Sequence, residues 1–133
     1  VSELHSCGKK VFLVSGGFVE LIHPVADALS IPREHVFANV LQYTPEGAYS
    51  GFDASQPTAA SGGKAKAIER ILASEPPGTE AVMIGDGVTD AEARPPAKAF
   101  IGFGGVVHRK AVEEKADLFL HSFKDAIEMV RAE

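Results

Sequence analysis

Short apolar runs alternate along the chain with longer segments in which apolar residues recur at helical spacing. The first run, Lys10 to Ser15 (KVFLVS), is rich in β-branched and aromatic residues. Because Gly16-Gly17 follows it, the pattern predicts a buried strand and then a tight turn. Later runs of the same kind predict strands over residues 81–84, 99–103 and 117–120.

The segments between these runs predict helices. Residues 18–29 carry a helical apolar stripe, in which Pro24 favours a break or a late start. A second amphipathic segment, 64–72, follows Ser61-Gly62-Gly63 and ends before Pro76-Pro77-Gly78. Further helices are expected from Ala91 to the Pro95-Pro96 stop, over 107–115, and after a capping box of Ser122 and Asp125, with Phe123, Ala126, Ile127 and Val130 facing inward.

One segment, residues 36–53, does not fit the alternation of strand and helix. Its aromatic and β-branched runs flank Pro45-Glu46-Gly47, which is the chemistry of a turn between antiparallel strands. We therefore expect a small β-hairpin here.

The order of the remaining elements indicates the fold class. Strands that alternate with helices, several of them uniformly apolar, predict an α/β fold with a mostly parallel sheet covered on both faces. In such sheets, ligands bind beyond the carboxyl ends of the strands. The length of 133 residues (14.0 kDa) is that of one domain and no linker is apparent, so we expect a single domain over residues 1–133.

Composition and charge exclude several classes of function. The net charge is −5 and the thirteen Lys and Arg residues are scattered, which argues against a nucleic-acid partner and favours a small-molecule substrate. No apolar run is long enough for a membrane span, and the polar start does not read as a signal peptide. One cysteine, Cys7, cannot form an internal disulfide, which fits a reducing compartment such as the cytoplasm.

Polar residues gather where the predicted strands end. Ser15 offers a hydroxyl, Gly16 and Gly17 allow backbone N–H groups to approach an anion, and Lys64 adds a positive charge at a helix N-terminus. These groups complement a phosphate. Taken alone, however, Ser-Gly-Gly at a strand end is more often only a turn, and a lone lysine is usually solvated.

Two aspartates follow the strand at 81–84. Asp86 supplies the oxygen ligand that Mg²⁺ prefers. Asp90 lies one helical turn further on, where it could orient Lys64 or a metal-bound water. The alternative interpretation of this pair is a helix cap and a surface charge, because aspartate is favoured at helix starts.

Two common nucleotide-binding motifs are absent. Gly63-Lys64 is followed by Ala65, and Thr58 stands where a Walker A loop begins with glycine. Gly102-Phe103-Gly104 fails the Gly-x-Gly-x-x-Gly pattern because position 107 is valine.

Five segments, in this order, carry a family resemblance: VFLVSGGF, HVFANV, SGGKAKAI, MIGDGVTDAEA and AFIGFGG, together with GFD and QPT. They resemble the haloacid dehalogenase superfamily, and within it the phosphoserine phosphatases. The resemblance runs nearly end to end. It implies a haloacid dehalogenase-like (Rossmannoid) three-layer core with a mostly parallel sheet, here incomplete, plus the small hairpin.

The resemblance also implies roles for individual residues. Ser15 matches the motif that binds the transferred phosphoryl group, with Gly16 and Gly17 as neighbouring substrate contacts. Thr89 matches a position that helps to hold substrate. Lys64 matches the lysine that neutralises charge on the phosphate and the nucleophile.

For the two aspartates, the resemblance implies that Asp86 binds Mg²⁺ and that Asp90 is the second acidic residue of the same motif. The implied activity is Mg²⁺-dependent hydrolysis of O-phospho-L-serine to L-serine and phosphate through an aspartyl-phosphate, the last step of serine biosynthesis. The implied compartment is the cytoplasm, or a plastid if the source is a plant or an alga.

The superfamily's first motif, Asp-x-Asp after an apolar strand, does not occur, since no two aspartates stand two apart. That motif supplies the nucleophile and the general acid in this superfamily. We therefore expect the chain to be the C-terminal portion of such an enzyme, without its nucleophile or helical cap and inactive alone. The alternatives are a short phosphate- or Mg²⁺-binding protein, which would form a homodimer, and a phosphatase of another small phosphomonoester.

Overall fold

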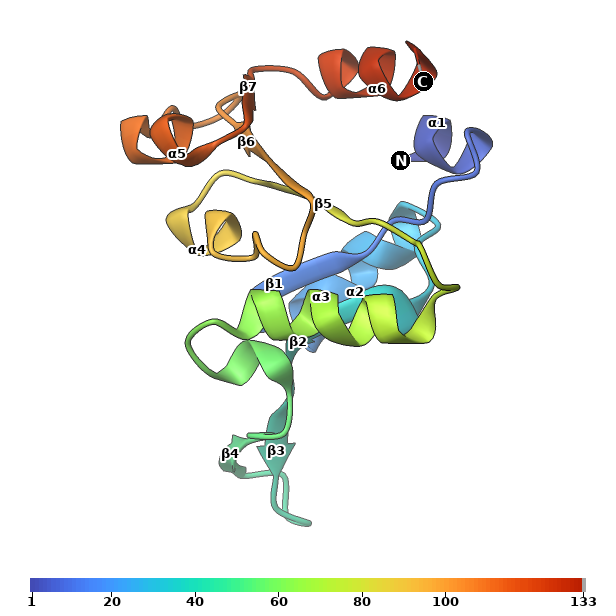
Figure 1. Cartoon of the computed structure of the whole chain (residues 1–133). Coiled ribbons are helices and arrows are strands. Elements are labelled where there is room, and N and C mark those ends of the chain that lie inside the picture. Colours follow the sequence, from blue (N-terminus) through green and yellow to red (C-terminus); the bar gives the residue numbers. More distant parts are fainter. Residues whose placement is uncertain (133) are drawn as a thin grey trace. The chain divides into compact units, whose positions relative to one another are not determined.

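The computed structural model describes residues 1–132 and divides into two compact units, Val1–Gly63 and Lys64–Glu133 (Figure 1). The single domain expected over residues 1–133 stays a prediction. Within the described part of the chain, no helix combines the length and apolarity that crossing a membrane requires.

The first unit is built on a pair of parallel strands, β1 (Leu13–Phe18) and β2 (Val36–Asn39). Helix α2 (Val19–Ala28) and the 3₁₀ turn η1 (Arg33–His35) connect the two strands. A short helix, α1 (Ser2–Ser6), precedes them, and a second 3₁₀ turn, η2 (Pro57–Ala59), follows. The core of the unit is small, and its buried apolar residues include Ala26, Ile31 and Ala38.

The end of β1 differs from the sequence prediction. Gly16 and Gly17 do not form a turn after the strand but lie within it, and the strand continues to Phe18. The pairing with β2 shifts register between Val14 and Phe18, so the glycines occupy an irregular stretch of a strand that does not end at them.

Pro24 does not interrupt α2, which begins at Val19 and continues through the proline to Ala28. Pro24 and Glu20, whose carbonyl loses its helical donor, are both exposed. Water can therefore satisfy that carbonyl, so the proline is tolerated without a break in the helix.

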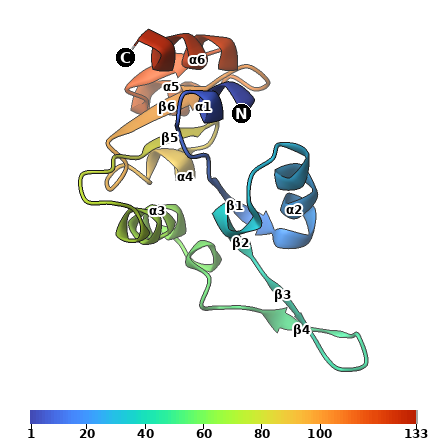
Figure 2. The ribbon, with the colours of Figure 1, turned by 90° about the vertical axis from the view of Figure 1, so that its right-hand side faces the viewer.

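The predicted hairpin is confirmed, but it is shorter than expected. Strands β3 (Leu41–Tyr43) and β4 (Tyr49–Phe52) pair in antiparallel fashion, and Figure 2 shows the hairpin extending away from the β1–β2 pair. Gly47, at φ +86°, makes the turn possible. Residues 36–39 pair with β1 instead, in a parallel ladder in which Ala38 is buried and the other three residues are partly buried.

The second unit holds a three-stranded parallel sheet in the order β5-β6-β7, with β5 (Val82–Gly85), β6 (Ala99–Phe103) and β7 (Leu118–Leu120). The helices are α3 (Gly63–Ser74), α4 (Val88–Ala91), α5 (Lys110–Lys115) and α6 (Phe123–Ala132). The core cluster of this unit consists of Ile68, Met83, Ala93, Ala97, Phe100 and Val112. The predicted α/β class, with parallel strands and a small hairpin, is confirmed.

Two helices of this unit begin elsewhere than predicted. Helix α4 begins at Val88 instead of Ala91, because Gly87 is its N-cap and Asp90 falls in its first turn. Helix α5 begins at Lys110 instead of Val107, because the chain after Gly105 stays irregular up to its N-cap, Arg109.

Candidate active site

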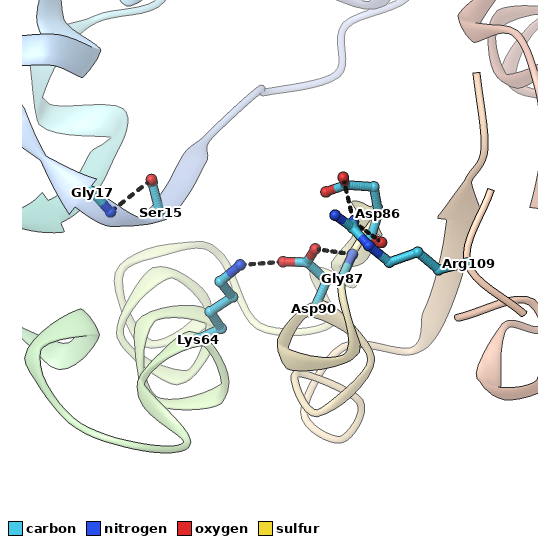
Figure 3. Close-up of polar contacts among 7 residues, drawn as sticks. All are labelled: Ser15, Gly17, Lys64, Asp86, Gly87, Asp90 and Arg109. Atoms are coloured by element: carbon cyan, nitrogen blue, oxygen red, sulfur yellow. Dashed lines mark hydrogen bonds and ion pairs between the residues drawn. The ribbon is translucent and has the colours of Figure 1, made fainter. Parts of the chain in front are cut away.

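The carboxyl end of β5 carries a buried carboxylate. The Asp90 side chain is only 7% exposed. One of its oxygens forms an ion pair with Lys64 Nζ, and the other accepts a hydrogen bond from the backbone N–H of Gly87 at 3.0 Å (Figure 3). Both oxygens are therefore satisfied by the unit itself, as a buried charge requires.

Gly85, the last residue of β5, makes room for this carboxylate. A Cβ atom at position 85 would collide with the Asp90 carboxyl group. Only glycine lets the strand and the first turn of α4 approach so closely. Packing against Asp90 therefore explains why glycine stands at position 85, whether or not a ligand binds there.

Asp86 has a different environment, because its side chain is 56% exposed. Arg109 Nη1 donates to both the backbone oxygen and the carboxylate Oδ2 of Asp86, each at 2.8 Å (Figure 3). Sequence reasoning missed Arg109. The signal that could have found it is a cation, in the stretch His108-Arg109-Lys110, shortly after the Gly104-Gly105 pair that follows β6.

In the first unit, the polar groups at the end of β1 are neutral. Ser15 Oγ accepts a hydrogen bond from the N–H of Gly17 at 3.0 Å. The backbone oxygen of Gly16 accepts one from Asn39 Nδ2 at 2.9 Å. Since Ser15 Oγ acts here as an acceptor, its own hydroxyl proton is available to donate elsewhere.

A second side chain extends this network. Thr58 Oγ1 donates to Asn39 Oδ1 at 3.0 Å, so η2 supports Asn39, and Asn39 holds Gly16. Sequence reasoning gave neither Asn39 nor Thr58 a role. Both lie in quoted segments, HVFANV and QPT, which could have marked them.

The structure therefore brings together some of the residues singled out from the sequence. Lys64 contacts Asp90, and Asp86 and the exposed Thr89 lie in the same β5–α4 segment. Ser15, Gly16 and Gly17 form their own cluster in the other unit. The meeting of both clusters at one sheet edge stays a prediction.

The donor chemistry of Asp86 fits Mg²⁺. A half-exposed carboxylate at a strand end offers hard oxygen, and Mg²⁺ is commonly held by one or two carboxylates together with water and substrate phosphate. Among the described residues there is no group of three His, Cys, Asp or Glu side chains that could hold a metal ion. The exposure of the Asp86 carboxylate leaves room for water and phosphate oxygens, which Mg²⁺ usually keeps as ligands.

Comparison with known proteins identifies the family. The model of the haloacid dehalogenase-like hydrolases matches residues 1–93. The chain belongs to this family, as its motifs suggested. Phosphatases of this family generally use Mg²⁺.

A curated relative gives the resemblance more detail. The chain is 47% identical over 127 residues to phosphoserine phosphatase of Bos taurus, an alignment that covers 96% of this chain and 56% of the relative. The chain thus spans about half the length of the curated relatives it matches.

Among the solved structures that resemble the chain are two with TM-scores of 0.80 and 0.85. One is a phosphoserine phosphohydrolase-like protein from Francisella tularensis, with a TM-score of 0.85 and 27% identity, covering 96% of this chain and 58% of the other. The second is DsGPDH of Dunaliella salina, with a TM-score of 0.80 and 37% identity, covering 97% of this chain but only 21% of the other.

Proposed function

We propose that the protein to which this chain belongs is a phosphoserine phosphatase, which hydrolyses O-phospho-L-serine to L-serine and phosphate. The observation that carries the proposal is the buried pair of Lys64 and Asp90 beside the half-exposed Asp86. The 47% identity to a phosphoserine phosphatase over 96% of the chain supports the choice of substrate.

The chain's own residues supply charge and hydrogen bonds for a phosphoryl group. Asp90 orients the Lys64 ammonium, whose positive charge offsets negative charge on phosphate oxygens. The Ser15 hydroxyl donates to a phosphate oxygen while Oγ keeps its bond from Gly17. Gly16 and Thr89 contribute further substrate contacts.

Asp86 would hold Mg²⁺, which when bound offsets charge on the transferring phosphoryl group. The carboxylate that attacks phosphorus and the acid that protonates the leaving alcohol are not among these 133 residues. The proposal assigns both to an Asp-x-Asp motif elsewhere in the complete gene product. Cytoplasm or plastid as the compartment, and a homodimer, stay predictions.

Asp86→Asn in the complete gene product tests the proposal. The amide cannot supply the anionic ligand, so we expect most Mg²⁺-dependent hydrolysis of O-phospho-L-serine to be lost, by about 100-fold or more. Asp125→Asn, at an exposed position of α6, is the matched control and should leave turnover unchanged. Wild-type turnover in Asp86→Asn contradicts the assignment.

A second candidate is hydrolysis of another small phosphomonoester. The observation in its favour is the 37% identity to DsGPDH, since this chain matches only 21% of that protein. A similar region therefore occurs in a much longer chain that does not carry the phosphoserine phosphatase name. A higher kcat/KM for another phosphomonoester than for O-phospho-L-serine would favour this candidate.

A further inference from the structure

Arg109 holds the one exposed carboxylate at the end of β5. A single nitrogen, Nη1, reaches both the backbone oxygen and Oδ2 of Asp86, each at 2.8 Å (Figure 3). The two side chains are 48% and 56% exposed, so water and ions reach the contact. Arg109 comes from the loop after β6, far from Asp86 in the sequence.

Asp90 does not offer a cation the same access. Its carboxylate is 7% exposed, and both oxygens are already bound, by Lys64 and by the N–H of Gly87. A divalent cation arriving at this loop therefore meets Asp86 first. There it meets a carboxylate whose charge is already balanced by a guanidinium.

We propose that Arg109 competes with the divalent cation for the Asp86 carboxylate. This inference rests on the proposed function, in which Asp86 is the metal ligand. A cation on Asp86 lies close to the guanidinium, and like charges at short range repel. A cation on either oxygen of the carboxylate weakens the bond from Arg109 to Oδ2, and this cost lowers the affinity for the metal.

A purely structural role for Arg109 makes a different prediction. The bond to the Asp86 backbone oxygen ties the loop before α5 to the loop after β5, and its loss would lower thermal stability. It would not raise the affinity for a cation. Metal affinity measured without substrate therefore separates the two roles.

The experiment measures Mn²⁺ binding to the complete gene product by electron paramagnetic resonance of the free ion, with no substrate present. Arg109→Ala should bind Mn²⁺ about two- to fivefold more tightly than the wild type, the upper part of the range expected for release of an exposed ion pair. Arg109→Gln removes the charge but keeps an N–H donor for the Asp86 backbone oxygen. It should show the same gain even if Arg109→Ala folds poorly.

Arg94→Ala is the matched control. Arg94 is an arginine of similar exposure in the same unit, 45% exposed, and it pairs with Asp117 at 2.9 Å instead of Asp86. Its removal changes the net charge by the same amount but frees Asp117 and not Asp86, so the Mn²⁺ affinity of this variant should stay within about twofold of wild type.

Asp86→Asn distinguishes failure of this inference from failure of the proposed function. If Asp86→Asn weakens Mn²⁺ binding but neither Arg109 variant tightens it, the competition is wrong and the metal assignment stands. If Asp86→Asn binds Mn²⁺ as the wild type does, both are overturned. Tightening in Arg94→Ala equal to that in Arg109→Ala also overturns the inference, because net charge alone would then explain it.

Discussion

The last residues of β1 and the segment after β5 both present polar groups, but they do so by opposite means. At β1, each contact is a neutral hydrogen bond: Gly17 to Ser15, Asn39 to Gly16, and Thr58 to Asn39. After β5, two of the contacts join full charges, Lys64 with Asp90 and Arg109 with Asp86. The residues at β1 are linked by neutral hydrogen bonds, whereas the residues after β5 form two ion pairs.

The difference shows what each end needs from the rest of its unit. A buried charge is stable only if every oxygen has a partner, so Asp90 depends on Lys64, Gly87 and the space left by Gly85. Neutral hydrogen bonds at a partly exposed strand end cost much less when one is lost. Substitutions at β5 should therefore have larger effects than those at β1.

The largest expected effect comes from Lys64→Ala. This change leaves the Asp90 carboxylate buried with only the Gly87 N–H as partner, and loss of one member of a buried pair is strongly destabilising. Since Lys64 is itself 21% exposed, we expect the free energy of unfolding to fall by about 2–4 kcal/mol. The measurement is denaturant unfolding of the complete gene product.

Lys66→Ala is the control for Lys64→Ala. Lys66 lies on the same helix, α3, and is exposed, so its loss should change the free energy of unfolding by less than about 0.5 kcal/mol. Equal losses in the two variants would mean that the Lys64–Asp90 pair adds nothing beyond a surface charge.

A pair of glycine substitutions compares the two strand ends directly. Gly85→Ala places a methyl group against the Asp90 carboxyl, so we expect a loss of about 1–3 kcal/mol in unfolding free energy. Gly16→Ala meets no atom within 4 Å, and φ at Gly16 is not positive, so stability should stay unchanged or rise slightly. Thermal unfolding of both variants checks the contrast, and a larger loss for Gly16→Ala would reverse it.

Much of the fold could be predicted from the sequence, because its elements have clear periodicity or punctuation. The apolar run at 99–103 became β6 without change, and the helix after Gly63 ended before Pro76 as expected. The pairing of Lys64 with Asp90 was one of the options foreseen for Asp90, beside a metal-bound water and a helix cap or surface charge. The sequence placed Lys64 at the start of a predicted helix and Asp90 about one helical turn after Asp86, and this placement favoured the pairing.

Other features could not be predicted, because they depend on contacts between distant loops. Arg109 falls in the helix predicted over 107–115 but stands before the first turn of α5, where the helical pattern does not indicate which way a side chain turns. The position of Gly16 and Gly17 inside β1 depends on pairing with β2, and the apolar pattern of residues 10–15 does not contain that information. Helix α4, four residues long, is too short to show a helical stripe.

The smallest expected effect concerns the pKa values of two carboxyl groups in the first unit, Asp27 with a charged partner and Asp53 with neutral partners. Hydrogen bonds from Arg33, at 2.8 and 3.2 Å, lower the pKa of Asp27, and the guanidinium charge adds to the shift. Asp53 has a lowered pKa mainly because the Ser55 hydroxyl, and then the Gln56 amide, donate to its carboxylate. Asp53 thereby fixes the turn that leads into η2 and Thr58.

Salt should affect these two carboxyl groups differently. A lowered pKa in the folded state means that each group stabilises the fold above about pH 4, the ordinary aspartate value, and loses this contribution as the pH falls through its own pKa. The partner of Asp27 is an exposed cation, so about 1 M salt should bring the pKa of Asp27 back toward its ordinary value. The partners of Asp53 are neutral, so its pKa should stay low.

Carboxyl-carbon NMR titrations at low and high salt measure both pKa values. A salt response of Asp53 as large as that of Asp27 would show that charge, and not neutral hydrogen bonding, supports the turn before η2.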